Sequence, residues 1–97
     1  MKIDKILNGS ELTIKLEGRL DTITSPDLEK ELVDLNEVNS IIFDFEKLEY
    51  ISSAGLRVLL SFQKKINTQG TMVIKNVKNE IKDVFEMTGF NGILTIE

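Results

Sequence analysis

The chain of 97 residues contains no histidine, no cysteine and no tryptophan. Without histidine it lacks the usual general base at neutral pH, which excludes a standard serine–histidine–aspartate hydrolase. The missing histidine and cysteine also remove the ligands that zinc prefers and any thiol nucleophile. Carboxylates remain, but their spacing does not match the calcium-binding loop of an EF-hand. We therefore expect no bound metal, no cofactor and no catalytic activity of its own.

Long apolar runs and an excess of basic charge are also missing. The longest strictly apolar runs, such as residues 41–43 and 58–60, are far shorter than the roughly 20 residues of a membrane span. Residues 1–11 lack the apolar segment of a signal peptide. Sixteen acidic residues against twelve basic ones give a net charge of -4, which repels nucleic acid. These features predict a cytoplasmic protein with no membrane span and no nucleic-acid partner.

The composition that is present is that of one ordinary folded domain. Hydrophobic residues make up 41% and charged residues 29% of the chain, and no segment has the composition of a linker. The length allows one modest hydrophobic core and no second domain. We expect a single domain over residues 1–97 and, for a small acidic domain, a monomer.

Strand patterns recur along the chain. Residues 11–17 alternate apolar and polar side chains, as in a strand with one wet face, and residues 2–7 form a weaker strand before them. Asn8 and Gly9 both tolerate positive φ and predict the hairpin turn between the two. Residues 41–45 and 71–75 indicate further buried strands, with residues 50–53 expected as a connecting loop. Residues 93–96 are expected to add a short edge strand.

Helical patterns separate these strands. Ser25, Pro26 and Asp27 predict a helix start, with Ser25 as the N-cap, and the helix continues to Asn36. A second helix is expected over residues 54–67, and a third over residues 78–88 that stops at Gly89. The whole pattern predicts an α/β fold with about three main helices and a mixed sheet of four to five strands. The sheet is expected to begin with the hairpin and continue with parallel strands joined by right-handed crossovers.

Residues 50–60, YISSAGLRVLL, place two hydroxyls and a glycine at the start of the second helix. Ser52 or Ser53 can cap this helix, and a cap needs only one hydroxyl. Glycine near the first turn costs up to about 1 kcal/mol relative to alanine, so either the backbone needs the room or a partner comes close. We expect Gly55 to leave the surface beside Ser53 uncovered. A helix N-terminus also favours a phosphate group.

Four segments in order resemble one known family. Residues 18–21 (GRLD) resemble its G-x-[LIV]-D motif, residues 41–45 (IIFDF) its apolar third strand with an aspartate, and residues 84–90 its last helix with a glycine exit. Residues 50–56 (YISSAGL) resemble [FY]-[IM]-D-S-[SA]-G-[LI], the most specific of the four. Together they resemble a STAS domain of the anti-sigma factor antagonist type, from about Leu12 to Phe90.

The resemblance implies a phosphorylation switch. In that family an anti-sigma factor that is also a serine kinase phosphorylates the serine that matches Ser53, and a serine phosphatase of the PP2C-like type resets the cycle. The unphosphorylated antagonist binds the anti-sigma factor and frees the sigma factor. Ser52 stands where the family commonly has aspartate, which makes Ser52 a rival phosphate acceptor. The residues expected to contact the partner are Asp21, Thr22, Ser52, Ser53, Ala54, Gly55, Leu56 and Arg57.

Three charged residues near these motifs have competing interpretations. Arg57 lies four residues after Ser53 and either pairs with a phosphate there or is an ordinary solvated arginine. Asp21 either forms a turn hydrogen bond or contacts the partner, and we favour the partner contact. Asp44 interrupts an apolar run and needs a hydrogen-bond partner. We expect it to brace the loop before Ser52.

Two other functions fit parts of the sequence. A STAS scaffold or transporter-accessory module would use the same surface without phosphorylation, and the missing aspartate at position 52 favours it. A receiver-like domain phosphorylated on Asp44 is the weaker alternative, because residues 2–7 lack the acidic pair that such a site needs.

Overall fold

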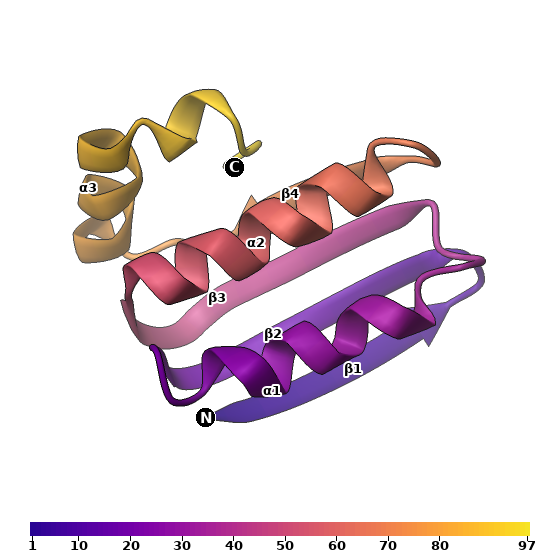
Figure 1. Ribbon diagram of the computed structural model, residues 1–97, viewed down its shortest axis with the longest axis horizontal. Coiled ribbons are helices and arrows are strands. Elements are labelled where there is room, and N and C mark those ends of the chain that lie inside the picture. Colours follow the sequence, from indigo (N-terminus) through magenta and orange to yellow (C-terminus); the bar gives the residue numbers. More distant parts are fainter.

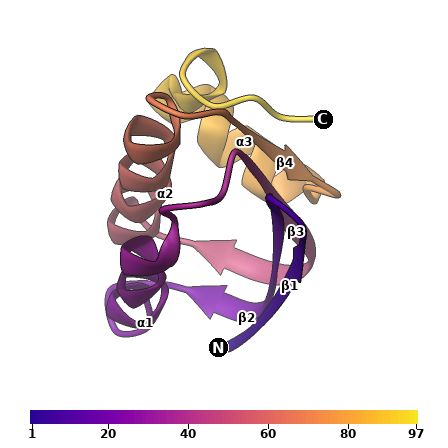
Figure 2. The same cartoon turned by 90° about the vertical axis from the view of Figure 1, so that its right-hand side faces the viewer.

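In the computed structural model, a four-stranded sheet carries helices on one of its faces (Figures 1 and 2). The structure describes residues 1–97, except for the side chain of residue 34. The strands are β1 (Lys2–Asn8), β2 (Glu11–Leu20), β3 (Ser40–Ile51) and β4 (Thr71–Lys75). They lie side by side in the order β1-β2-β3-β4. β1 pairs with β2 antiparallel, whereas the β2–β3 and β3–β4 pairs are parallel. The predicted mixed sheet is confirmed.

The helices are α1 (Ser25–Glu29), α2 (Ser53–Ile66) and α3 (Asn79–Thr88). Two 3-10 segments accompany them, η1 (Lys30–Asp34) directly after α1 and η2 (Phe90–Gly92) after α3. α1 and α2 lie side by side over the same face of the sheet (Figure 2). None of the described helices has the length and apolar character needed to cross a membrane.

The core forms between this face of the sheet and the helices. The inward side chains of β2 and β3, among them Ile14, Leu16 and Phe43, are fully buried. Phe43 meets Phe62 of α2 edge-on, with ring centroids 5.2 Å apart. Phe85 of α3 stacks near Phe45 at 6.5 Å, which places α3 on the same side of the sheet as α2.

Three local predictions are wrong. The hairpin turn consists of Gly9 and Ser10, and only Gly9 has positive φ, at 64°. Ser25 does not cap α1 with its side chain; instead its hydroxyl donates to Asp21 O at 2.5 Å. Residues 50 and 51 belong to β3 and not to a loop.

The C-terminal segment is less regular than expected. Residues 93–96 form a single parallel bridge, between Ile74 and Ile96, in place of a full edge strand. Ile74 N donates to Thr95 O at 2.9 Å, and Glu97 N donates to Ile74 O at 2.8 Å. This segment therefore covers the outer edge of β4. Gly89 ends α3 with φ of 79°, as predicted.

Candidate functional site at the start of α2

The first turn of α2 is held against the end of β2. Ser52 is the only residue between β3 and α2. Its N–H donates to Leu20 O at 2.9 Å, which ties the turn to the last residue of β2. Because β2 and β3 are parallel neighbours, the loop after β2 and the start of α2 meet at the same edge of the sheet.

The two serines have different positions. Ser52 is the N-cap, with extended φ and ψ of -101° and 175°, and its Oγ accepts a hydrogen bond from Gly55 N at 3.4 Å. Leu56 N donates to Ser52 O at 3.0 Å and closes the first turn. Ser53 is the first residue of the helix and is exposed. The capping hydroxyl therefore belongs to Ser52, and the hydroxyl of Ser53 has no hydrogen-bond partner among the described groups.

Gly55 is required because there is no room for a side chain at this position. The expectation that it leaves the surface beside Ser53 uncovered is wrong. Gly55 is buried, and a Cβ there would lie 2.8 Å from Leu20 Cγ and 3.0 Å from both Ile51 Cγ1 and Leu20 O. Leu56 is buried as well, with 3% of its surface exposed. Both residues therefore support the site from beneath, and their side chains are not part of its surface. Ala54 is half-buried.

The loop after β2 is held together by the carboxylate of Asp21. Its Oδ1 accepts hydrogen bonds from the N–H groups of Ile23 and Thr24, both at 3.0 Å. The hydroxyl of Thr24 donates to Arg19 O at 2.7 Å and accepts from Asp21 N at 2.9 Å. Asp21 therefore has the turn role, and its contact with a partner stays a prediction.

These hydrogen bonds lower the pKa of Asp21 below its ordinary value of 3.8. The N–H of Thr24 contributes most, followed by the N–H of Ile23, the hydroxyl of Thr24 and the charge of Arg19, while desolvation opposes them. The loop is thus held by an ionised carboxylate at neutral pH.

Arg19 and Tyr50 form a second support beside this loop, which the sequence alone did not indicate. They are register partners at the ends of β2 and β3, and the guanidinium carbon lies 4.1 Å from the centre of the tyrosine ring. Arg19 Nε also lies 3.7 Å from Asp21 Oδ2. The arginine therefore connects the ring to the loop. The register of the two strands is the signal that would have found this pair, and it requires β3 to continue past residue 47 beside the end of β2.

Exposed side chains surround Ser53. Thr22 and Arg57 are exposed, and Ile23 has 86% of its surface exposed on the tightly held loop. Arg57 has no ion-pair partner among the described side chains, so its pairing with a phosphate on Ser53 stays a prediction. The first turn of α2 contains no acidic residue. Among the described residues, the site thus presents two hydroxyls without a hydrogen-bond partner, those of Thr22 and Ser53, together with one cation and one exposed apolar side chain.

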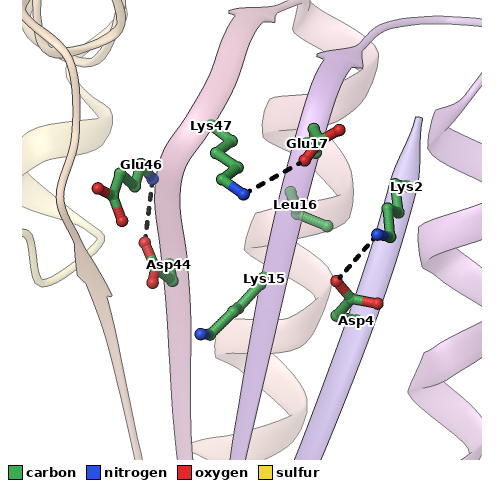
Figure 3. Close-up of a pocket in the computed structure, with 8 residues that line it drawn as sticks. All are labelled: Lys2, Asp4, Lys15, Leu16, Glu17, Asp44, Glu46 and Lys47. Carbon is green, nitrogen blue, oxygen red and sulfur yellow. Dashed lines mark hydrogen bonds and ion pairs between the residues drawn. The ribbon is translucent and has the colours of Figure 1, made fainter.

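Asp44 lies elsewhere, and the prediction that it braces the loop before Ser52 is wrong. It points outward from the middle of β3 (Figure 3). Its Oδ1 accepts hydrogen bonds from Glu46 N and from Asn76 Nδ2, both at 3.0 Å. Asn76 follows β4 and has φ of 59°. Asp44 therefore ties β3 to the turn after β4, and it is not at a strand end as a receiver-like phosphorylation site would need.

The pKa of Asp44 is below its ordinary value of 3.8. Burial raises this pKa, but the hydrogen bonds from Asn76 and Glu46 N, with the charges of Lys15 and Lys47, outweigh it. Among the described residues no group of three or more acidic side chains is placed to hold a metal ion.

The family of the chain follows from comparison with known proteins. The model of the STAS domain family matches residues 2–97. The chain belongs to the STAS domain family. BtrV of Bordetella bronchiseptica, which is assigned as an anti-sigma factor antagonist, is 38% identical over 100 residues that cover 99% of this chain and 84% of BtrV. The anti-sigma-B factor antagonist of Staphylococcus aureus is 28% identical over 86% of this STAS chain and 80% of its own length.

A solved structure supports the same fold. The structure of the Bacillus cell fate determinant SpoIIAA in its phosphorylated form covers 99% of this STAS chain and 91% of its own, with a TM-score of 0.77 and 19% identity. At that identity the likeness concerns the fold, and the STAS-type α/β architecture expected from the sequence is confirmed.

Proposed function

We propose that this STAS protein is an anti-sigma factor antagonist whose binding to its partner is controlled by phosphorylation of Ser53. The observation that carries the proposal is the separation of the two serines. Ser52 caps α2, which leaves the Ser53 hydroxyl exposed and without a hydrogen bond to the described groups. The replacement of the family's aspartate by Ser52 keeps the capping function, because both residues are good N-caps.

The proposed partner is an anti-sigma factor that is also a serine kinase. Its contact surface on this chain comprises the exposed groups around the start of α2, namely Thr22, Ile23, Ser53 and Arg57, with Asp21, Ser52 and Ala54 at their base. Ile23 is an apolar side chain on a loop that four hydrogen bonds hold. A rigid apolar group of this kind loses little entropy on binding and is suited to a pocket beside the partner's catalytic site.

Phosphorylation would switch binding off through charge. A phosphate adds about -1.5 to -2 charges at pH 7, at a point that must lose its water when the partner docks. The free N–H groups at the start of α2 and the guanidinium of Arg57 would hold the phosphate against the chain itself. A serine phosphatase of the PP2C-like type would restore binding. In this cycle Ser53 is a substrate, and ATP and Mg²⁺ belong to the kinase.

The relatives support the regulatory part of the proposal. BtrV and the Staphylococcus aureus protein are both named as anti-sigma factor antagonists, and each aligns with most of this chain. Which sigma factor is released is set by the partner.

The phosphorylation step is tested by intact mass after incubation with the anti-sigma factor kinases of the same cell, ATP and Mg²⁺. We expect one added phosphate on the wild type and on Ser52→Ala, and none on Ser53→Ala. A phosphate that persists in Ser53→Ala and disappears in Ser52→Ala would move the site to Ser52. No added mass on any form would favour the STAS scaffold or transporter-accessory module over the switch.

The binding step is tested by calorimetry with the same partner. Ser53→Asp, which carries part of the phosphate charge, should weaken binding by about tenfold or more. Ser61→Asp introduces the same charge at an exposed position two turns along α2 and should leave the affinity nearly unchanged. Equal affinities for Ser53→Asp and the wild type would overturn the proposed switch.

A further inference from the structure

The second face of the sheet has no helix over it, and its side chains follow an ordered pattern. The outward residues of β1, β2 and β3 remain exposed or half-buried. They include the seven charged residues drawn in Figure 3, which line a hollow of about 180 Å³ together with the buried Leu16. We call this surface the open face. Figure 2 shows it on the side of the sheet away from α1 and α2.

An apolar row crosses the open face from edge to edge. Strand register places Ile6 opposite Thr13, Thr13 opposite Ile42, and Ile42 opposite Val73. Ile6 has 51% of its surface exposed, and the other three side chains are half-buried. Three of the four side chains, Ile6, Ile42 and Val73, are β-branched aliphatic groups on the face of the sheet that α1 and α2 do not cover.

The next row on the open face alternates in charge. The same register aligns Asp4 with Lys15, Lys15 with Asp44, and Asp44 with Lys75. The signs across the sheet are therefore negative, positive, negative, positive. Beyond it, Glu17 of β2 is paired in register with Lys47 of β3.

This order of charges is complementary to itself. A two-fold axis that runs parallel to the strands, between β2 and β3, brings a second open face onto the first and reverses each row. Asp4 then faces Lys75 of the other copy, and Lys15 faces Asp44. In the apolar row Ile6 faces Val73 and Thr13 faces Ile42. In the row beyond, Glu17 faces Lys47. No like charges face each other in these register pairs, and two sheets packed face to face in this way have the aligned geometry of a β-sandwich.

Asp44 accepts two hydrogen bonds of 3.0 Å, but the ion pairs on the open face are loose. The ion pairs Lys2–Asp4, Lys47–Glu17 and Lys75–Glu97 have distances of 3.9, 3.8 and 3.7 Å. Such exposed pairs contribute little and can exchange partners at low cost. Lys15 makes no ion pair within the described chain, although its charge lowers the pKa of Asp44.

We propose that the open face is a homodimer interface in which two copies of this chain pair around that two-fold axis. This revises the expectation of a monomer. The four strands at about 4.8 Å spacing and about five residues at about 3.3 Å rise give a flat area of only about 300 Å², which is small beside the roughly 800 Å² that each partner buries in a standard interface. The dimer is therefore weak and forms at high local concentration. It leaves both copies of Ser53 free, since α2 lies on the other side of the sheet.

The test is a charge exchange followed by sedimentation equilibrium at low salt and up to millimolar protein. Asp4→Lys places lysine opposite Lys75, and Lys75→Glu places glutamate opposite Asp4, twice in each homodimer. Each variant alone should dimerise about tenfold or more weakly than the wild type. An equimolar mixture should recover wild-type association, because the introduced lysine of one variant then faces the introduced glutamate of the other, while the unchanged Lys75 and Asp4 also meet.

Matched controls carry the same charge changes on α3. Asp83→Lys and Lys82→Glu are exposed there and should dimerise like the wild type, and thermal melting should show all variants folded. A wild type that stays monomeric at millimolar concentration overturns the proposal. So does a dimer that both open-face variants leave unchanged, which would place the contact at another surface such as the edge of β1. Failure of the mixture to recover association also overturns it. None of these outcomes bears on the phosphorylation of Ser53.

Discussion

Gly55 is the residue on which the position of α2 depends. The first turn of α2 approaches the end of β2 so closely that a methyl group at position 55 would meet both a side chain and a backbone oxygen, Leu20 Cγ at 2.8 Å and Leu20 O at 3.0 Å. The leucine side chain can shift, but the carbonyl is fixed by its hydrogen bond from Ser52 N. The glycine therefore sets the place at which Ser53 is presented.

Gly55→Ala should lower the free energy of unfolding by about 1 to 3 kcal/mol, as overpacking does at a tight contact. Gly92→Ala is the matched control, since a Cβ there has no atom within 4 Å and its φ is ordinary. That control should change stability by less than about 1 kcal/mol in either direction. Urea denaturation monitored by circular dichroism measures both. Equal losses in the two variants would mean that the contact with Leu20 has no energetic importance.

Ser52 and Ser53 should differ in stability as well as in phosphorylation. Ser52→Ala removes the cap of α2 and should destabilise the protein by about 1 kcal/mol, whereas Ser52→Asp keeps a capping oxygen and should restore most of that loss. Ser53→Ala should stay within about 0.5 kcal/mol of the wild type, because this side chain is exposed and makes no hydrogen bond to the described groups. Thermal melts of the three variants compare them. A larger loss in Ser53→Ala than in Ser52→Ala would reverse the assignment of the cap.

The sequence locates these residues but not their partners. The motif and the helix start identify positions 52 and 53 as the centre of the site, and capping rules require only one of the two hydroxyls. The burial of Gly55 depends on Leu20, which is far away in the chain, and the tie from Asp44 depends on Asn76. Such contacts follow from strand order and register, and no local pattern contains them.

At the scale of elements, the predicted bounds of strands and helices agree best with the structure where the sequence has a single clear periodicity, either that of a strand or that of an α-helix. β4 and the end of α3 were predicted within a residue or so. β3 extends to Ile51 because its pairing with β2 resumes after a register shift near residues 15–17, so residues that lack a clean alternation still lie in the sheet. The first helix changes from α to 3-10 geometry after Glu29, and apolar spacing at three and four residues is compatible with both geometries.

The link between β3 and the turn after β4 gives a pH-dependent prediction. Asn76→Gly keeps a residue that tolerates φ of 59° but removes the hydrogen bond to Asp44, so the pKa of Asp44 should rise towards its ordinary value of 3.8. In the wild type the lowered pKa adds stability above the unfolded-state pKa, and this stability is lost as the pH falls through the folded-state value. The wild type and Asn76→Gly should therefore differ most in free energy of unfolding at neutral pH. This difference should become smaller as the pH falls into the acid range.

Carbon NMR of the Asp44 carboxyl group, followed from pH 7 downward, measures this change directly. The titration midpoint in Asn76→Gly should lie above that of the wild type. Asn91→Gly, an exposed asparagine in η2, serves as a control that should leave the midpoint unmoved. Identical midpoints in wild type and Asn76→Gly would show that Asn76 does not affect the charge of Asp44.

At the scale of the whole molecule, the helices cover one face of the sheet only. The site at the start of α2 and the open face are therefore two separate surfaces. The alternation of helices and strands along the chain was enough to predict a mixed sheet with parallel crossovers. It could not predict the open face, because the alignment of the charged row requires the register of three strand pairs. Ser53 lies at the edge of the sheet where α2 begins, and the rows of the open face point away from α2.

This separation predicts that phosphorylation of Ser53 acts only near the site. The phosphate is held at the start of α2, and at physiological salt its charge is largely screened beyond about 8 Å. In proton–nitrogen NMR spectra, shifts on phosphorylation should be confined to residues 19–24 and 50–57. The amides of Ile6, Ile42 and Val73 should stay in place, and self-association should have the same equilibrium constant. Shifts that spread across the open face, or a dimer that phosphorylation strengthens or dissolves, would mean that the sheet couples the two surfaces and that one protein partner can control access to the other.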